Sequence, residues 1–144
     1  MKTQKGFTLI ELIVVIVILG ILGAVALPKF VNVASDARGS VIKGVAGSMA
    51  AANALIYSKA SINGTLTGTT VVNTVNVTTI GGFGSTAAQV ALVMDLQPAA
   101  DFNTATANQI RHARAATVGA TCAVTYTVPT ATTPPAYLVD ISTC

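Results

Sequence analysis

One carboxylate, Glu11, lies inside an otherwise apolar stretch near the N-terminus, and its chemistry calls for a partner. The stretch runs from Phe7 to Leu27 and follows a short basic segment that ends at Gly6. A carboxylate within a membrane-spanning helix costs on the order of 2.5–3.5 kcal/mol, and such residues usually mark a functional site. No Lys, Arg or His lies between residues 6 and 28. The side chains of this stretch therefore supply no neutralising cation.

Cleavage of the chain would create the missing cation. A cut after Gly6 would expose the α-amine of Phe7. Phe7 and Glu11 are four residues apart, which places them on one face of a helix. The amine could then meet the carboxylate of its own helix or that of a neighbouring copy. A cleavage site and a carboxylate at this spacing would therefore explain each other.

The apolar stretch is long enough to cross a membrane. It covers 21 residues, and a helix of this length measures about 32 Å, close to the roughly 30 Å of a bilayer core. Lys2 and Lys5 precede it, so the positive-inside tendency predicts a cytoplasmic N-terminus and export of the remaining chain.

Two other interpretations of this stretch stay open at this point. A secretory signal peptide would also begin with basic residues, and Ala24-Val25-Ala26 is similar to its small-residue cleavage site. The protein would then be a secreted, soluble binding module that starts near Leu27. However, the apolar stretch is longer than the usual 7–15 residues, and Glu11 would serve no purpose in a discarded segment. The second alternative is a plain single-span anchor that tolerates Glu11 near the interface.

The sequence Gly6-Phe-Thr-Leu-Ile-Glu11 resembles the leader junction of type IV pilins, of the type IVa class, and of the related pseudopilins. The resemblance implies that a prepilin peptidase cleaves after Gly6 and methylates the new amine of Phe7. It also implies that Glu11 neutralises the amine of an adjacent subunit and sets the register during fibre assembly. Further along, Ala26–Phe30 and Val31–Arg38 resemble mannose-sensitive haemagglutinin pilins most closely.

The resemblance implies a structural role rather than a catalytic one. The expected function is that of the major subunit of a type IV pilus, a homopolymer that serves adhesion and surface attachment. The expected partners are the prepilin peptidase, the inner-membrane assembly machinery, the membrane before assembly, and a receptor of unknown identity. The expected location is the inner membrane and then the surface pilus of a Gram-negative bacterium. The alternative is a major pseudopilin of a type II secretion or competence system. Such proteins usually lack a C-terminal cysteine pair and carry an acidic calcium loop.

The N-terminal helix is expected to continue beyond the apolar stretch to about residue 60. Pro28 removes a backbone donor at a cost of about 3 kcal/mol in a helix interior. Gly20 and Gly23 weaken the same turns by up to about 1 kcal/mol each. The sequence therefore predicts a kink or local melting between Gly20 and Pro28.

Between Phe30 and Lys59, apolar residues recur at the spacing of one helix face. This predicted face consists of Val31, Ala34, Val41, Val45, Met49, Ala52 and Ile56. The expected fold is therefore α+β, with a long helix over residues 7–60 packed on a small antiparallel sheet. Residues 1–6 form the cleaved leader, residues 7–27 the membrane and polymerisation segment, and residues 61–144 the globular head.

The head is expected to contain three strands and one short helix. Val- and Thr-rich segments predict strands over Val71–Ile80, Thr121–Val128 and Tyr137–Ile141. Thr86 and Gln89 have the spacing of a capping box, which predicts a helix from there to about Leu96.

The two cysteines are predicted to form a disulfide bond. Antiparallel pairing of the last two predicted strands carries Cys122 towards Cys144. The apolar alternation of these strands demands an odd offset, so a one-residue slip or a bulge would be needed to join the sulfur atoms. Neither a CxxC motif nor a nearby His supports a metal or redox site instead. The resemblance to pilins implies the same bond.

The remaining sequence offers little other chemistry. His112, the single histidine, lies between Arg111 and Arg114 and is expected to be a solvated surface residue on a helix or loop. No catalytic order of Ser, His and Asp, acid pair or phosphate-binding loop accompanies it. We therefore expect no enzymatic activity, cofactor or metal. The net charge is +3 and no basic stripe exists, so nucleic-acid binding is not expected.

Overall fold

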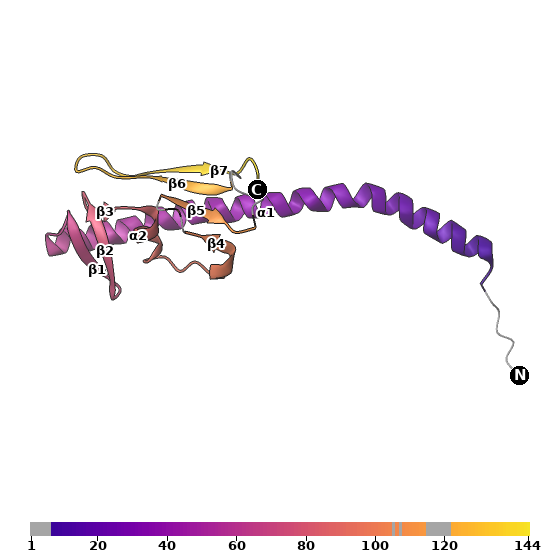
Figure 1. Ribbon diagram of the computed structural model, residues 1–144, viewed down its shortest axis with the longest axis horizontal. Helices are drawn as coiled ribbons and strands as arrows, with labels where there is room; N and C mark the ends of the chain where they lie inside the picture. The colour runs from indigo at the N-terminus through magenta and orange to yellow at the C-terminus, as the bar shows by residue number, and fades with distance from the viewer. Residues whose placement is uncertain (1–6, 105, 107, 115–121) are drawn as a thin grey trace, which may run out of the picture. The chain divides into compact units, whose positions relative to one another are not determined.

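The computed structural model describes residues 7–104, 106, 108–114 and 122–144, with the backbone alone at residues 27–32. The chain divides into two compact units, Met1–Ser35 and Asp36–Cys144. Helix α1, Leu9–Asn63, contributes residues to both units, and all other labelled elements belong to the second unit (Figure 1). The long helix and the antiparallel strands confirm the predicted α+β class.

The ends of α1 differ from the predicted ends because of local capping. The helix starts at Leu9 rather than Phe7, since Thr8 acts as its N-cap. It ends at Asn63 rather than near residue 60, where Gly64 takes a positive φ of 66°. The Thr65 N–H then donates to the carbonyl of Ala60 at 2.8 Å, as expected of a helix stopped by a glycine. The backbone is helical at Gly20, Gly23 and Pro28 alike, and a kink there stays a prediction.

The second-unit part of α1 buries one face in the head. Among the predicted residues, Val45, Met49, Ala52 and Ile56 are buried, whereas Ala34 and Val41 are exposed. Ile42 is fully buried in place of Val41. Ile42 and Val41 precede Val45 by three and four residues, so both lie near its face of the helix. The helix turns Ile42 inward and leaves Val41 exposed. The side chain of Val31 lies outside the described residues.

The first sheet contains three antiparallel strands, β1 (Gly68–Val72), β2 (Val75–Ile80) and β3 (Phe83–Gly84). The prediction of one strand over Val71–Ile80 was wrong because the chain turns at Asn73 and Thr74. These residues have φ values of 47° and 70°, which suits a two-residue hairpin turn. Gly81 and Gly82 make the second turn in the same way, with φ values of 60° and 88°.

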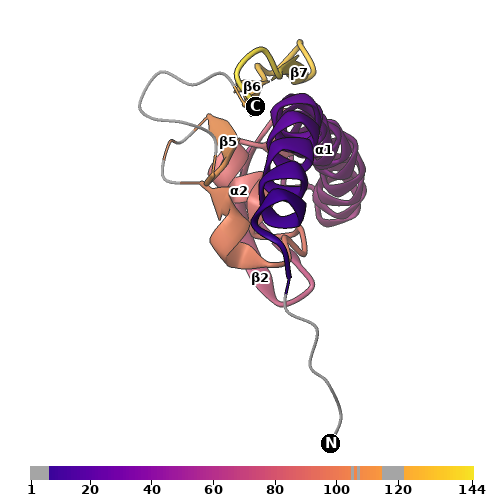
Figure 2. The same ribbon diagram turned by 90° about the vertical axis from the view of Figure 1, so that its right-hand side faces the viewer.

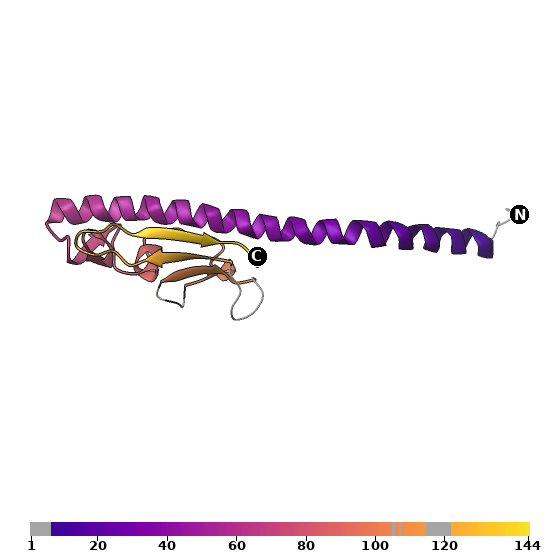
Figure 3. The ribbon, with the colours of Figure 1, turned by 90° about the horizontal axis from the view of Figure 1, so that it is seen from above.

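The second sheet has four antiparallel strands in the order β4-β5-β6-β7. Their bounds are Phe102–Asn103, Gln109–His112, Ala123–Thr127 and Ala136–Asp140. Strands β6 and β7 confirm two predicted strands, although Thr121 lies outside the described residues. β4 and β5 were not predicted, and the head holds two sheets rather than one. Figure 3 shows β6 and β7 side by side along the second-unit part of α1.

Helix α2, Ala87–Ala91, forms only half of the predicted capping box. The Gln89 N–H donates to the Thr86 hydroxyl at 3.2 Å. The Gln89 side chain, however, accepts the N–H of Thr78 at 2.9 Å instead of returning to Thr86. The helix ends well before the predicted Leu96. The N–H groups of Val93 and Met94 donate to carbonyls three residues earlier, rather than four as in an α-helix. α2 lies next to β5 (Figure 2), and the short 3-10 helix η1, Ala99–Asp101, follows it.

A buried polar network connects α1 to both sheets. The Asn53 side-chain amide donates to the hydroxyls of Tyr126 at 3.3 Å and Tyr137 at 2.8 Å. Its carbonyl oxygen accepts the Gly84 N–H at 2.9 Å, and the Tyr126 hydroxyl donates to the Gly84 carbonyl at 2.6 Å. Burial raises the pKa of both Tyr126 and Tyr137, and the hydrogen bonds from Asn53 offset part of this effect.

The predicted disulfide joins Cys122 and Cys144, whose Cα atoms are 4.7 Å apart. The strand pairing has the odd offset that the apolar alternation required, with Tyr126 opposite Tyr137. The expected slip or bulge was wrong, because the register from Ala123 to Thr127 is continuous. A turn after β7 brings Cys144 back instead, with its N–H donating to the Ile141 carbonyl at 3.3 Å.

Candidate assembly site at the start of helix α1

Thr8 and Glu11 form a capping box at the start of α1. The Glu11 carboxylate accepts the Thr8 N–H at 2.8 Å and the Thr8 hydroxyl at 2.7 Å. In return, the Glu11 N–H donates to the Thr8 hydroxyl oxygen at 3.4 Å. This reciprocal arrangement satisfies two of the N–H groups that lack partners at a helix start.

The capping box gives Glu11 a role that sequence reasoning missed. The signal was present, because a Thr followed three residues later by Glu, before an apolar run, is the pattern of such a box. In an apolar environment an unpaired backbone N–H costs several kcal/mol. Helix capping is therefore a second reason, besides charge pairing with an amine, for an acid at position 11.

The structure brings Phe7 and Glu11 to the same place. Together with Ile10, Val14 and Val15 they line a shallow, open depression at the start of the helix. The Phe7 side chain is 91% exposed, so its ring is free to contact a neighbouring surface. Gly6, the predicted cleavage residue, lies outside the described residues.

The apolar stretch behind this site is not buried by the residues that the structure describes. Leu9–Ala26 is long and apolar enough to cross a membrane, and none of it is buried. The stretch Val33–Asn63 passes the same test of length and composition, but 39% of it is buried, as expected of a helix that packs on the head. The large apolar side chains of Leu9–Ala26 need contact with lipid or with other protein.

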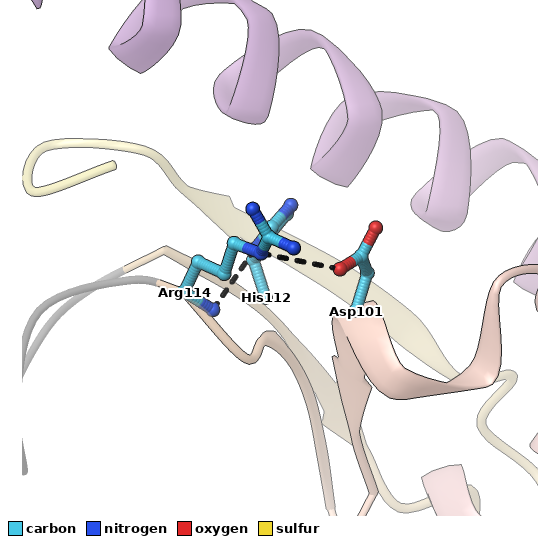
Figure 4. Close-up of polar contacts among 3 residues, drawn as sticks. All are labelled: Asp101, His112 and Arg114. Atoms are coloured by element: carbon cyan, nitrogen blue, oxygen red, sulfur yellow. Dashed lines mark hydrogen bonds and ion pairs between the residues drawn. The ribbon is translucent and has the colours of Figure 1, made fainter.

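His112 is not the solvated residue that the sequence predicted. It lies on strand β5 and is only 8% exposed. β5 is central in its sheet, and its alternation turns both Ile110 and His112 inward. The His112 Nδ1 accepts the N–H of Arg114 at 3.2 Å, while Arg114 also pairs with Asp101 at 3.5 Å (Figure 4).

Metal-ligand side chains do not cluster in the part of the chain that the structure describes. Within residues 7–104, 106, 108–114 and 122–144, no group of three or more His, Cys, Asp or Glu side chains could hold a metal ion. The contacts of His112 are those of a side chain that closes a turn. The start of α1 is thus the place where the predicted functional residues gather.

Comparison with known proteins shows what the N-terminal part of this chain is similar to. Residues 1–27 match the family described as the prokaryotic N-terminal methylation motif. The chain is 44% identical to a type IV major alpha-pilin of Moraxella bovis over 64 residues, which cover 43% of this chain and 40% of that protein. The N-terminal region is thus similar to that of type IV pilins.

Other relatives of this pilin-like chain belong to fibres and to a secretion system. It is 40% identical to fimbrial protein Q of Moraxella bovis over 84 residues, 57% of this chain and 53% of that protein. It is 47% identical to the type II secretion system core protein G of Pseudomonas aeruginosa over 51 residues, 35% of this chain and 36% of that protein. The chain spans about half, or less, of these relatives. No solved structure gives a significant match. Closeness to mannose-sensitive haemagglutinin pilins is not confirmed and stays a prediction.

Proposed function

We propose that this chain is a major structural subunit of a type IV pilus and polymerises through the N-terminal part of α1. The observation that carries this proposal is an exposed apolar helix, Leu9–Ala26, that lies within the methylation motif over residues 1–27. Burial of such a surface against copies of itself would provide the main driving force for assembly. The fibre would serve adhesion and surface attachment, without enzymatic activity.

Processing and assembly follow from the residues at the junction. A prepilin peptidase would cut after Gly6 and methylate the amine of Phe7. The subunit would remain in the inner membrane of a Gram-negative bacterium through Leu9–Ala26 until the assembly machinery moves it into the surface fibre. There, Glu11 of one subunit would meet the Phe7 amine of another and set their register.

The pseudopilin alternative shares this N-terminal region, as the similarity to a type II secretion protein indicates. The disulfide between Cys122 and Cys144 favours a pilin, since the major pseudopilins usually lack such a pair. A conventional signal peptide is less favoured, because the methylation motif extends across the whole segment that would be removed.

Intact-mass analysis of protein sheared from cells tests this proposal. We expect a chain that begins at methylated Phe7, recovered from filaments visible by electron microscopy. A chain beginning near Leu27 would contradict both the cleavage and the polymerisation through α1. A correctly processed chain found only in membranes, without surface filaments, would support the pseudopilin instead.

A further inference from the structure

Strand β1 forms an unprotected edge of the first sheet. It pairs with β2, and the strand order β1-β2-β3 places its other side at the border of the sheet. Thr69 is exposed, and Val71 is 52% exposed. β1 contains neither a charged residue nor a proline. These are two of the devices by which natural proteins prevent edge strands from pairing with other chains.

The turn between β1 and β2 determines which backbone groups face this open side. Val72 and Val75 flank the two-residue turn, so they exchange both of their backbone hydrogen bonds. Such pairs alternate along an antiparallel ladder. Thr70 therefore also bonds to β2, which leaves the N–H and C=O groups of Thr69 and Val71 directed outward.

The far side of β2 agrees with this assignment. Thr78, which lies opposite Thr69, directs its backbone away from β1. Its carbonyl accepts the Ser85 N–H at 2.9 Å, and its N–H donates to the Gln89 side chain at 2.9 Å. Ser85 and the α2 residue Gln89 thereby occupy the edge of β2 that the two residues of β3 leave uncovered.

The two edges of the second sheet carry protection that β1 lacks. β4 is only two residues long and directly follows Asp101. β7 is preceded by Pro134 and Pro135 and ends at Asp140. Short strands, prolines and charges at edges all oppose pairing with another chain.

We propose that β1 pairs with β1 of a second copy of this chain, antiparallel and across a two-fold axis. The register that pairs all of the outward groups places Thr69 of each copy opposite Val71 of the other, with Thr70 opposite itself. Two three-stranded sheets thereby join into one sheet of six strands. Residues 61–94 contain no Asp, Glu, Lys, Arg or His, so no like charges oppose the approach of two identical edges.

The two-fold axis indicates which copies pair. Subunits of a fibre built by one repeated rotation and translation are always displaced along its axis, whereas a two-fold contact relates its partners by a pure rotation without displacement. The β1 pairing therefore joins subunits of different fibres side by side. This last step rests on the proposed pilus function, while the pairing of two β1 strands does not.

A charged substitution on the open edge tests the contact between fibres. Val71→Lys is compared with Leu138→Lys, which adds the same charge to an exposed position on β7. We expect purified Val71→Lys fibres to remain single, with a several-fold smaller fraction sedimenting at low speed than in wild type. Leu138→Lys fibres should bundle like wild type. Unchanged bundling of Val71→Lys, or equal dispersal of both variants, would overturn the proposal.

Cysteine cross-linking tests the register and does not depend on fibre formation. Full-length Thr69→Cys and Val71→Cys chains in detergent are oxidised separately and as a mixture. The proposed register places position 69 of one copy opposite position 71 of the other, so the mixture should give several-fold more cross-linked dimer than either variant alone. Equal yields in all three samples would reject the β1 pairing, even if the fibres themselves assemble normally.

Discussion

At the scale of single residues, Glu11 carries two separable chemical roles. Its carboxylate caps α1 by accepting from both the N–H and the hydroxyl of Thr8. In the proposed fibre the same carboxylate also provides a negative charge for the amine of a neighbouring Phe7. Each role alone would justify a polar residue at the start of an apolar helix, so the two must be separated by substitution.

Three variants separate the cap from the charge. Gln also completes a capping box, so Glu11→Gln keeps the cap but loses the charge. Thr8→Val removes the capping hydroxyl but keeps the charge of Glu11. Glu11→Val removes both the capping carboxylate and its charge. We expect Glu11→Gln and Glu11→Val to be exported, processed and retained in the membrane but to build few or no fibres, measured as sheared pilin. Thr8→Val should assemble, with α1 weakened by about 1 kcal/mol.

The opposite pattern would change the role assigned to Glu11. If Glu11→Gln gave normal fibres and Thr8→Val gave none, capping would be the essential function and charge pairing would be excluded. Thr8→Ser keeps the hydroxyl and serves as the control, with assembly expected to match wild type.

The buried tyrosines predict a loss of stability at alkaline pH. Burial raises the pKa of Tyr126 and Tyr137 above that of a free phenol, which is about 10. A group with a raised pKa in the folded state contributes its stability fully below the unfolded pKa and loses it as pH rises towards the folded value. The free energy of unfolding should therefore fall as pH rises above about 10.

Phenolate absorbance during a pH titration checks this prediction. The curve of the folded full-length chain should lie at higher pH than that of the same chain in denaturant. Tyr126→Phe should bring the two curves closer together, because it removes one of the late-titrating groups. Coincident folded and unfolded curves would show that burial does not hold the phenols neutral.

At the scale of elements, the turn between β2 and β3 depends on glycine. Gly81 has a φ of 60°, and a Cβ atom there would lie 2.5 Å from the carbonyl oxygen of Thr130. Gly81→Ala should therefore lower the free energy of unfolding by about 1–3 kcal/mol. Gly44 in α1 is the matched control, because a Cβ atom there would meet nothing within 4 Å. Gly44→Ala should raise stability by up to about 1 kcal/mol.

Denaturant unfolding of the dissociated full-length chain measures both substitutions. The opposite signs are the essential result, because the chemical change is identical. A loss of stability at Gly44 as large as that at Gly81 would mean that the positive φ and the nearby carbonyl do not limit the turn.

The sequence predicted those elements whose signals are local. The buried face of α1 follows from helical spacing, and the start of α2 from the Thr86 hydroxyl. The β1–β2 hairpin was missed because its turn uses Asn73 and Thr74 rather than the usual glycine at the second position. β5 was missed because Gln109–His112 has a single aliphatic side chain, and the burial of His112 arises only in the folded chain.

The candidate site was predictable in position but not in all of its contacts. Spacing and the leader junction indicated Phe7 and Glu11. The hydrogen bonds from Thr8 to Glu11 are also encoded locally, in the Thr-x-x-Glu pattern of a capping box. The place of Cys144 depends instead on a turn after β7 that pairing rules alone do not specify.

At the scale of the whole molecule, the described chain combines an unburied apolar helix with a well-connected head. In the head, Asn53 joins α1 to β3, β6 and β7, and the disulfide fixes Cys144 beside the start of β6. Arg38 of α1 also donates to the Cys144 carbonyl. These ties hold the head together, while the apolar side chains of residues 9–26 remain exposed.

The lack of charge in the first sheet also affects digestion. Residues 60–110 contain neither Lys nor Arg, so trypsin can cut only after Lys59 and Arg111 at the borders of this region. Lys59 lies within α1 and Arg111 within the central strand β5, and such bonds must first unfold locally to enter a protease cleft. A fibre of this subunit would carry more than fifty consecutive residues through a trypsin-rich environment as a single uncut piece.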